Sequence, residues 1–461
     1  MKLRSDPIRP PPWREVFRGR RGWLTAGLLL LEALVAIEAL VVTTILPAVR
    51  HDLGGIQYYG WAFSASALAT FATIPIAGRA TDRYGPRGPL GLSFAVYIAG
   101  LVISGVAPSM LILVVGRFVQ GCAGGAFYSV SLGTVAKTYP EGLRPRVLAL
   151  LASMWILPGL IGPSFGALLA STVGWRWAFI APIPFMALAG ALILPTMRDV
   201  RVEPDAAVTL SLRWPIQLML GAGSLLAGVT SPSAWSLVLV PAGIAAGLPA
   251  LRRIAPAGTF RARPGLPAAA MAAFLLSVAF GAAEGFVPLM LTGVRHLSVG
   301  EASIVVTLVT VCWALGSWWQ SRRMGRLGAA PLVTIGAAML AVGIAGGATA
   351  LVSGPIAAPY VAWSIAGAGM GIAFPTIPLA VMGLATAGKE AGELSSTLLM
   401  DNLGIGIGAG LGGASIAIAK NAGIGLAAGL AGAFGVGLVA ALALVLVAKR
   451  LPSGAPIDSQ S

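Results

Sequence analysis

Charged residues are scarce in this chain of 461 residues: only 10% are Asp, Glu, Lys or Arg, against about a quarter in soluble domains. This scarcity excludes the two or more soluble domains that the length would otherwise predict. Cysteine and histidine are rarer still, with two residues of each. Cys122 and Cys312 both lie inside apolar runs, which favours small core residues over a disulfide or a metal site. We expect neither a metal nor a cofactor.

Apolar residues dominate what remains, at 57% of the chain, with a mean hydropathy of +0.86 and 61 glycines. Such a composition is typical of an integral membrane protein, whose helices pack closely through glycine. The net charge of +15 would also suit nucleic acid, but the basic residues lie in short loops between apolar runs. We therefore expect membrane lipids and no nucleic acid as surroundings. The first apolar run is too long for a signal-peptide core and is expected to remain as a span.

A membrane span needs roughly 20 mostly apolar residues. Fourteen runs meet this need and together predict an all-α polytopic protein: 23–47, 58–78, 89–107, 110–136, 147–171, 176–196, 214–230, 234–251, 267–292, 302–320, 331–352, 356–385, 394–419 and 423–448. The seventh and eighth runs are short. The alternative is a protein of twelve spans, in which this pair lies on the membrane surface as an amphipathic hairpin.

The basic residues give the orientation. With the N-terminus in the cytoplasm, 26 of the 31 Lys and Arg residues fall on the inner side and 4 on the outer side. Cytoplasmic loops carry such an excess of positive charge. We therefore predict a multi-pass protein of the cytoplasmic (inner) membrane with both termini in the cytoplasm. The same count fits twelve spans and fourteen.

The two halves of the chain share a short sequence pattern. The tripeptide Val-Arg-His ends the first predicted span at 49–51 and recurs at 294–296. Aligning the copies places Glu38 next to the position of Glu284, so each half carries a glutamate 11 or 12 residues before its outer arginine. That spacing corresponds to roughly 16–18 Å along a helix, which is about mid-membrane. Internal repeats with sites near the midplane are common in transporters.

A charged stretch, GRATDRYGPRG at 78–88, lies between the second and third spans. Its three arginines fit the orientation rule, but Asp82 does not, because acids contribute little to orientation. The second half repeats the basic residues at 321–328 and has Gly325 in place of the acid.

Several motifs resemble those of the major facilitator superfamily, specifically the fourteen-helix branch of its drug:proton antiporters. They are Gly78, Asp82, Arg83, Tyr84, Gly85 and Arg87 between spans 2 and 3; 116–121 (GRFVQG) in span 4; Gly159, Gly162, Pro163 and Gly166 in span 5; 38–47 (EALVVTTILP) in span 1; and 174–179 (GWRWAF) in an outer loop. The matches are incomplete: Pro86 replaces a usual arginine, Pro158 and Ala167 replace usual glycines, and Glu38 replaces a usual aspartate.

The resemblance implies a major facilitator fold with alternating access. We expect a cytoplasmic basic tail at 1–22, an N-terminal six-helix bundle at 23–196, a linker with two extra spans at 197–266, a C-terminal six-helix bundle at 267–449 and a cytoplasmic tail at 450–461. The implied function is export of small amphipathic or cationic compounds by a monomer, driven by the proton gradient. A lipid or metabolite exporter is the alternative. A polytopic membrane enzyme is more remote, because the sequence has no clustered acid site and no P-loop.

Five charged residues fall inside the predicted spans, where charge is costly and marks function by default. They are Glu32, Glu38, Arg117, Glu284 and Asp401. We assign Glu38 first as the proton carrier. The alternative is that Glu38 is a structural partner of Arg117. The resemblance implies that Arg117 tunes the proton affinity of a carboxylate. Glu284 either takes part in transport or holds an interhelical hydrogen bond, and Asp401 is assigned to substrate or protons.

Glu32 lies six residues before Glu38, which turns it away by about 120° on a helix. It is expected to pair with another helix or to reach inner water. Gly159, Gly162, Pro163 and Gly166 predict a kinked, closely packed span 5, which in the antiporter branch seals a leak path. The motif at 78–88 is expected to act as a latch, with Asp82 meeting the start of span 13 near 393–396 and Arg83 and Arg87 pairing with acids. For Trp61, Trp155 and Trp363, packing is favoured over an aromatic pocket.

Overall fold

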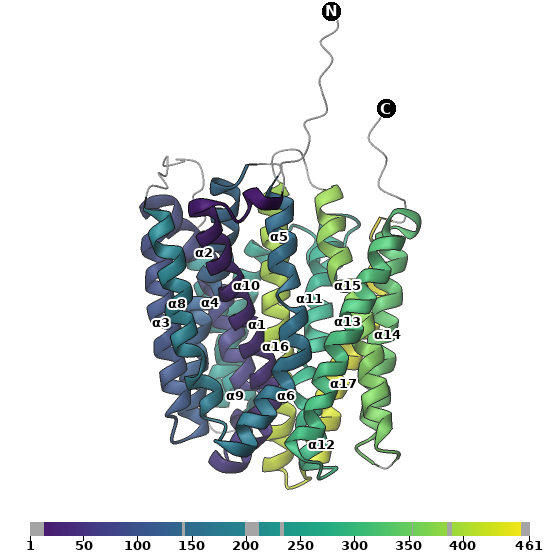
Figure 1. Cartoon of the computed structure of the whole chain (residues 1–461). Helices are drawn as coiled ribbons and strands as arrows, with labels where there is room; N and C mark the ends of the chain where they lie inside the picture. Colours follow the sequence, from purple (N-terminus) through teal and green to yellow (C-terminus); the bar gives the residue numbers. More distant parts are fainter. Residues whose placement is uncertain are drawn as a thin grey trace, which may run out of the picture.

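The computed structural model describes residues 13–140, 143–198, 212–230, 235–352, 354–384 and 390–452, and within these ranges the chain is helical with no strand. The helices run side by side, and both termini leave the molecule at one end, which we call the terminal end (Figure 1). We call the opposite end the distal end. Most of the predicted tails and the start of the predicted linker lie outside the described residues.

The first half of the chain forms the helices that precede residue 198. They are η1 (Trp13–Glu15), α1 (Gly19–Leu53), η2 (Ile56–Tyr58), α2 (Trp61–Tyr84), α3 (Arg87–Gly105), α4 (Met110–Thr138), α5 (Arg144–Ser153), α6 (Ile156–Thr172), α7 (Trp177–Ile180), α8 (Pro182–Ile193) and η3 (Leu194–Met197). Two helices and a short turn follow: α9 (Arg213–Thr230), α10 (Ser236–Ile254) and η4 (Thr259–Arg261).

The second half comprises α11 (Leu266–Gly281), η5 (Glu284–Phe286), α12 (Val287–Gly293), α13 (Val299–Leu327), α14 (Ala329–Thr349), α15 (Ala357–Leu384), α16 (Glu390–Asn421) and α17 (Leu426–Ala448). Taken with their interruptions, the described helices make fourteen passes through the bundle. Twelve of them are long and apolar enough to cross a membrane by length and composition alone. The other two are the interrupted pass α5–α6 and α9, in which Arg213 and Gln217 lower the mean hydropathy.

The two halves end corresponding helices in the same way. Gly85 follows α2 with φ +81°, and its N–H donates to Thr81 O. Gly328 follows α13 with φ +74°, and its N–H donates to Met324 O. A positive φ at a helix end favours glycine because no Cβ is present to clash. The repeated basic motif therefore serves the same local structural purpose in both halves.

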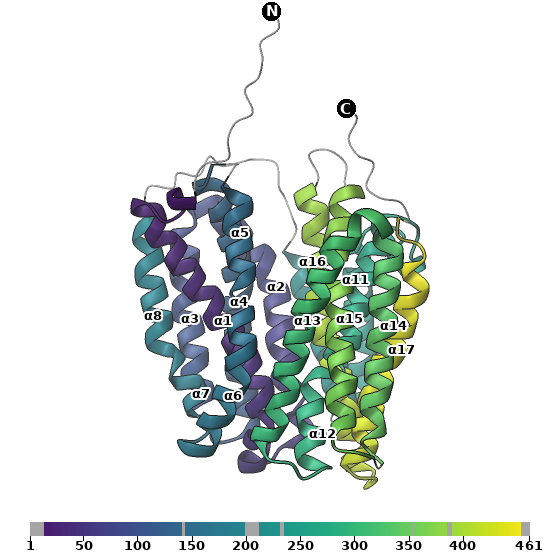
Figure 2. The same cartoon turned by 45° about the vertical axis from the view of Figure 1, so that its right-hand side comes forward.

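The helices of the two halves lie on two sides of the molecule and approach each other at the distal end (Figure 2). Two hydrogen bonds join the halves there: Tyr59 Oη donates to Gly285 O at 3.0 Å, and Lys420 Nζ donates to Gln57 Oε1 at 2.9 Å. Gly60 also packs directly on the α16 backbone. The described structure is therefore closed at the distal end.

Two hydrogen bonds at the terminal end each join elements of one half. Arg20 of α1 donates to Thr196 O through Nε at 2.9 Å. Arg450, which follows α17, donates to Ala262 O at 3.1 Å. Each half thus has a hydrogen bond of its own at this end.

Helices α9 and α10 form an antiparallel pair, and α9 packs against both α2 and α16. Its buried residues Leu218, Ala222 and Leu226 join a core cluster with Phe71 of α2 and Leu403 of α16. Trp61 Nε1 donates to Thr230 Oγ1 at 3.1 Å. Packing between helices of both halves contradicts the surface-hairpin alternative, and fourteen passes are the observed architecture.

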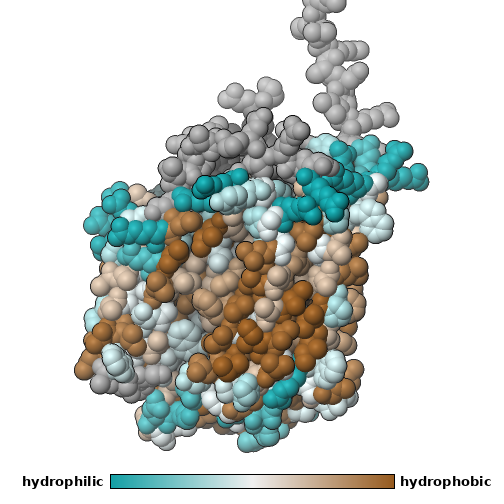
Figure 3. All heavy atoms as spheres, turned by 90° about the vertical axis from the view of Figure 1, so that its left-hand side faces the viewer, coloured by the Kyte–Doolittle hydropathy of each residue, from teal (hydrophilic) through white to brown (hydrophobic). Residues whose placement is uncertain are grey.

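The outer surface matches a membrane environment. Seen from the side of α3 and α8, apolar side chains predominate across the middle, and hydrophilic side chains gather at the two ends (Figure 3). The exposed large apolar residues of α3, α4 and α8 include Val102, Val115, Phe185 and Leu188. The described part of the molecule is therefore a multi-pass helical membrane protein.

Candidate functional site

An ion pair between Glu38 of α1 and Arg117 of α4 lies inside the first half. Arg117 Nη1 contacts Glu38 Oε1, and each residue is only 6% exposed. The sequence analysis gave pairing with Arg117 as the alternative to proton carriage by Glu38, and the structure brings the two residues together.

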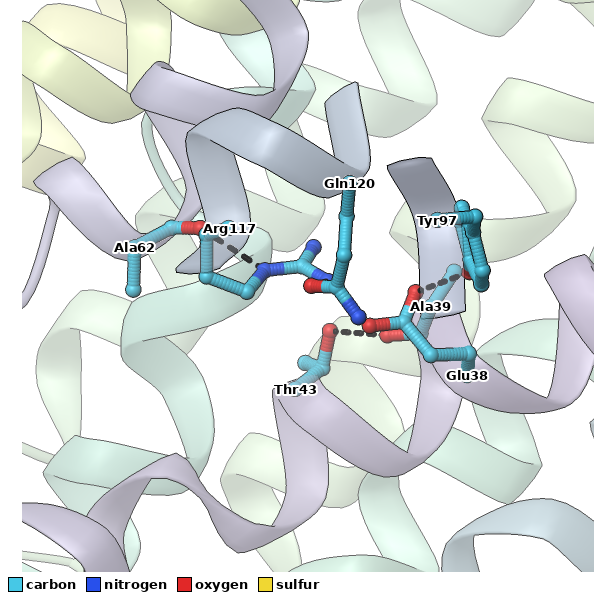
Figure 4. A network of polar contacts seen from close by, with 7 residues as sticks. All are labelled: Glu38, Ala39, Thr43, Ala62, Tyr97, Arg117 and Gln120. Carbon is cyan, nitrogen blue, oxygen red and sulfur yellow. Dashed lines mark hydrogen bonds and ion pairs between the residues drawn. The ribbon is translucent and has the colours of Figure 1, made fainter. Parts of the chain in front are cut away.

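Three more groups complete the surroundings of this pair (Figure 4). Arg117 Nε donates to Ala62 O at 3.1 Å, and Nη1 donates to Gln120 Oε1 at 2.8 Å. Tyr97 Oη donates to Glu38 Oε2 at 3.3 Å. The site thus joins α1, α2, α3 and α4 through a single guanidinium and a single carboxylate.

Small residues allow α4 to bring Arg117 this close. A Cβ on Gly116 would lie 2.8 Å from Ser104 N of α3, and one on Gly100 would lie 2.8 Å from Gln120 N. Glycine at both positions lets the two backbones nearly touch. The glycine that precedes Arg117 in the GRFVQG motif, together with Gly100 on α3, therefore lets α3 and α4 approach closely around the arginine.

The site contains one negative charge, on Glu38, and one positive charge, on Arg117. A buried charge is stable only when it is paired and hydrogen-bonded, and here the two opposite charges neutralise each other. Protonation of Glu38 would remove one charge and leave Arg117 buried without a counter-ion. Protonation of Glu38 would therefore remove the ionic part of the contact between α1 and α4.

The structure places Glu32 on the same helix but against a different partner. Trp155 Nε1 donates to Glu32 Oε1 at 2.8 Å. Trp155 lies in the interruption between α5 and α6, and its side chain is 41% exposed. Glu32 itself is half-buried. Glu32 thus has a hydrogen-bond partner in the break between α5 and α6.

Glu284 lies in the second half, in the one-turn 3-10 helix η5 that separates α11 from α12. No hydrogen bond or ion pair reaches its carboxylate from the described residues. The following residue, Gly285, packs on the ring of Phe63 and accepts the hydrogen bond of Tyr59. Glu284 is therefore next to the contact between the two halves and lacks the partner that Glu38 has.

Asp401 of α16 accepts a hydrogen bond from Ser277 Oγ of α11. The residue is half-buried. Ser277 precedes Phe280 by one helical turn, and Phe280 packs with Trp313 and stacks on Trp363 with centroids 5.9 Å apart. Trp363 is fully buried, which agrees with the packing role expected for it.

The glycines of span 5 face two neighbours. A Cβ on Gly159 would meet Thr310 of α13, with Thr310 Cβ at 3.0 Å. One on Gly166 would lie 2.9 Å from Val41 Cγ1 of α1. Gly162 has more room, with its nearest neighbour, Leu40 Cβ, at 3.8 Å, and Pro163 lies inside α6. The motif thus packs α6 against its own half and against the opposite half.

The predicted latch is described only in part. The side chain of Asp82 and those of residues 391–395 lie outside the described residues, so the structure does not address their contact. Gly78 has open space around it, and Gly85 ends α2. Arg83 stacks over Tyr84 at 5.3 Å, and neither Arg83 nor Arg87 pairs with an acid among the described residues. Asp82 and the other acids of 141, 199–205 and 390–393 lie outside the described residues or have undescribed side chains, so the predicted pairing stays a prediction.

Two residues of the site were not assigned from sequence. Gln120 lies three residues after Arg117, a spacing that puts both on one helix face, and could have been found. Tyr97 lies on α3 without any motif around it, so only the tertiary structure identifies it. No group of three His, Cys, Asp or Glu residues that could hold a metal occurs in the described part of the chain.

Sequence comparison matches this chain to one family model and to relatives named as multidrug transporters. The sequence model of the Major Facilitator Superfamily matches residues 28–409. A "probable multidrug-efflux transporter" of Mycobacterium tuberculosis is 28% identical over 95% of this chain and 98% of its own length. The multidrug transporter protein MdtP of Bacillus subtilis is 22% identical over 80% of this chain and 70% of its own length.

Solved structures share the fold at low identity. A D-xylose-proton symporter has a TM-score of 0.69 at 14% identity and covers 94% of this chain and 99% of its own. An auto-inhibited peptide transporter of the POT family has a TM-score of 0.68 at 16% identity, covering 95% of this chain and 99% of its own.

Proposed function

This chain belongs to the major facilitator superfamily, and from that membership we propose that it is a proton-coupled exporter of small amphipathic or cationic compounds. Members of this family are membrane transporters, so the protein is a multi-pass transporter and not an enzyme. The named efflux function of its relatives over nearly the whole chain supports drug-like substrates.

The observation that carries the proposal of proton coupling is the buried pair of Glu38 and Arg117. Intramembrane acids are costly and mark proton relays and ion pathways. Protonation of Glu38 releases Arg117 and loosens the joint between α1, α2, α3 and α4. In this mechanism the protonation state of Glu38 biases the equilibrium between distally closed and distally open forms, which is alternating access.

The second half supplies the groups for the substrate in this proposal. Glu284 is free of described partners, and Asp401 is half-buried with a hydrogen bond from Ser277. A carboxylate in the membrane interior attracts an organic cation through its charge. If the cation and the proton cannot be bound at the same time, each transport cycle exchanges one for the other. The inward proton gradient then drives the cation out.

The orientation proposed from the basic loops puts the terminal end in the cytoplasm of a cytoplasmic membrane. The distally closed form is then the one that accepts substrate from inside. We propose that the protein works as a monomer, since both groups of helices needed for alternating access come from one chain.

Glu38→Gln tests the coupling. The substitution keeps the side-chain shape and removes the titration, so we expect loss of proton-driven substrate uptake into inverted vesicles, by at least about tenfold. The matched control is Glu301→Gln, an exposed acid at the distal start of α13. A folded, monodisperse Glu38→Gln protein with normal proton-driven uptake would remove Glu38 from the mechanism. Addition of a protonophore to the unsubstituted protein must also abolish uptake.

A further inference from the structure

The two halves meet along a seam formed by α6 and α13. The contact includes Gly159 against Thr310. Trp155 lies four residues before Gly159, which is about one helical turn toward the terminal end. Its exposed indole is therefore about one turn from this contact.

Trp155 is the polar partner that Glu32 has among the described residues. An ionised carboxylate can accept about four hydrogen bonds, and the indole N–H provides one. Glu32 is half-buried at a depth where an acid needs a functional reason. The pair thus has unused capacity to bind a cationic group, and the exposed indole is beside it.

The surface around the pair is apolar and exposed on both sides of the seam. Leu157, just after Trp155, and Leu315 of α13 are both 60% exposed. One turn further toward the terminal end, Trp318 is exposed, with Arg322 stacked 3.8 Å over its ring. A molecule dissolved in the bilayer therefore meets apolar side chains on both helices of the α6–α13 seam.

The opposite seam, between α2 and α16, is covered. Helix α9 packs on both, Trp61 is hydrogen-bonded to Thr230, and Leu226 fills the space over Gly410. A Cβ on Gly410 would lie 2.6 Å from Leu226 Cδ2. A molecule that enters from the bilayer on that side would have to separate α9 from both α2 and α16.

We propose that Glu32 and Trp155 form an access site that binds amphiphilic monocations from the bilayer, on the α6–α13 side of the molecule. The carboxylate neutralises the cationic head, the indole face adds a cation–π contact, and the exposed apolar side chains hold the hydrophobic body. This inference rests on the proposed function as an exporter of such compounds, and it adds where they are first bound and which chemistry selects them.

Equilibrium binding to the full chain in lipid nanodiscs, without a gradient, tests the site. The probes are tetraphenylphosphonium and the neutral triphenylphosphine oxide. Glu32→Gln is expected to weaken tetraphenylphosphonium binding at least about tenfold and to leave the neutral probe unchanged. Trp155→Phe keeps an aromatic ring and is expected to weaken the cation less. Glu15→Gln, which removes an acid before α1, is the matched control and should change neither.

Equal losses for the charged and neutral probes, or unchanged cation binding in a folded Glu32→Gln protein, would overturn the proposal. Tetramethylammonium, which does not partition into lipid, separates the two sources of substrate. Competition by this probe at concentrations similar to those of tetraphenylphosphonium would indicate binding from water and contradict access from the bilayer.

A photoreactive alkylammonium probe locates the path. Adducts are expected between residues 153 and 168 and between 307 and 318, and their loss in Glu32→Gln would link them to the site. Adducts concentrated on 212–254 instead would place access on the side covered by α9 and overturn the proposal. Because binding is measured without a proton gradient, a failure of Glu38 in the coupling test leaves these outcomes unaffected.

Discussion

Glu38 and Glu284 are the same residue type near corresponding positions of the two halves, but their surroundings differ. Glu38 is held by Arg117 and Tyr97, whereas Glu284 has no described partner and lies in a break between helices. A paired buried charge contributes to stability only as long as its partner remains, because either charge alone would stay desolvated. The two acids therefore differ in how far the fold depends on them.

Matched Glu→Gln substitutions measure this difference. Glu38→Gln leaves the Arg117 guanidinium buried without a counter-ion, so we expect a loss of about 3 kcal/mol in the free energy of unfolding. Glu284→Gln breaks no described interaction and is expected to change stability by less than about 1 kcal/mol. Thermal unfolding of both purified proteins in the same detergent checks this. Equal unfolding temperatures would contradict a stabilising role for the ion pair.

At the scale of elements, α6 is the helix that contacts both halves. Gly166 faces α1 of its own half, and Gly159 faces Thr310 of the opposite half. Pro163 lies between them inside the helix, where a missing N–H and a bulky ring favour a kink. The motif that the sequence assigned to close packing therefore acts between the halves as well as within one.

Alanine at two glycines of the same helix separates these roles. Gly159→Ala would force Thr310 to move, and such overpacking costs about 1–3 kcal/mol, so we expect a weaker contact between α6 and α13 and a reduced transport rate. Gly162→Ala has its nearest neighbour at 3.8 Å and should transport normally. Equal rates for the two variants, measured in proteoliposomes with the same amount of protein, would refute a specific role for the Gly159 contact.

At the scale of the whole molecule, distal closure depends on a contact between two glycine backbones. A Cβ on Gly413 would lie 2.7 Å from Gly60 Cα, and one on Gly60 would lie 2.6 Å from Ala409 O. Backbone atoms cannot rotate aside as a side chain can. The distally closed form therefore requires glycine at this crossing of α2 and α16.

Gly413→Ala is expected to shift the population toward a distally open form. Spin labels at His51 and Ile424, two exposed positions of the distal end, report the change as longer distances after Cys122 and Cys312 are replaced. Gly435→Ala on α17, where nothing lies within 4 Å of an added Cβ, is the control and should leave the distances unchanged. A distance distribution identical to that of the glycine protein would show that the crossing does not limit closure.

The sequence by itself determined the membrane class and the family, because hydrophobic runs of span length and the motifs between them are local signals. It left twelve and fourteen spans open, and the packing of α9 against α2 and α16 decided for fourteen. It also identified the intramembrane charges, since each is conspicuous against apolar neighbours. The sequence also offered Arg117 as a partner of Glu38, but the other partners were decided only by tertiary structure: Tyr97 donates to Glu38, Ala62 accepts from Arg117, and Trp155 donates to Glu32 from the break in span 5. Helix positions around a bundle depend on packing between segments far apart in the chain, and no local pattern encodes them.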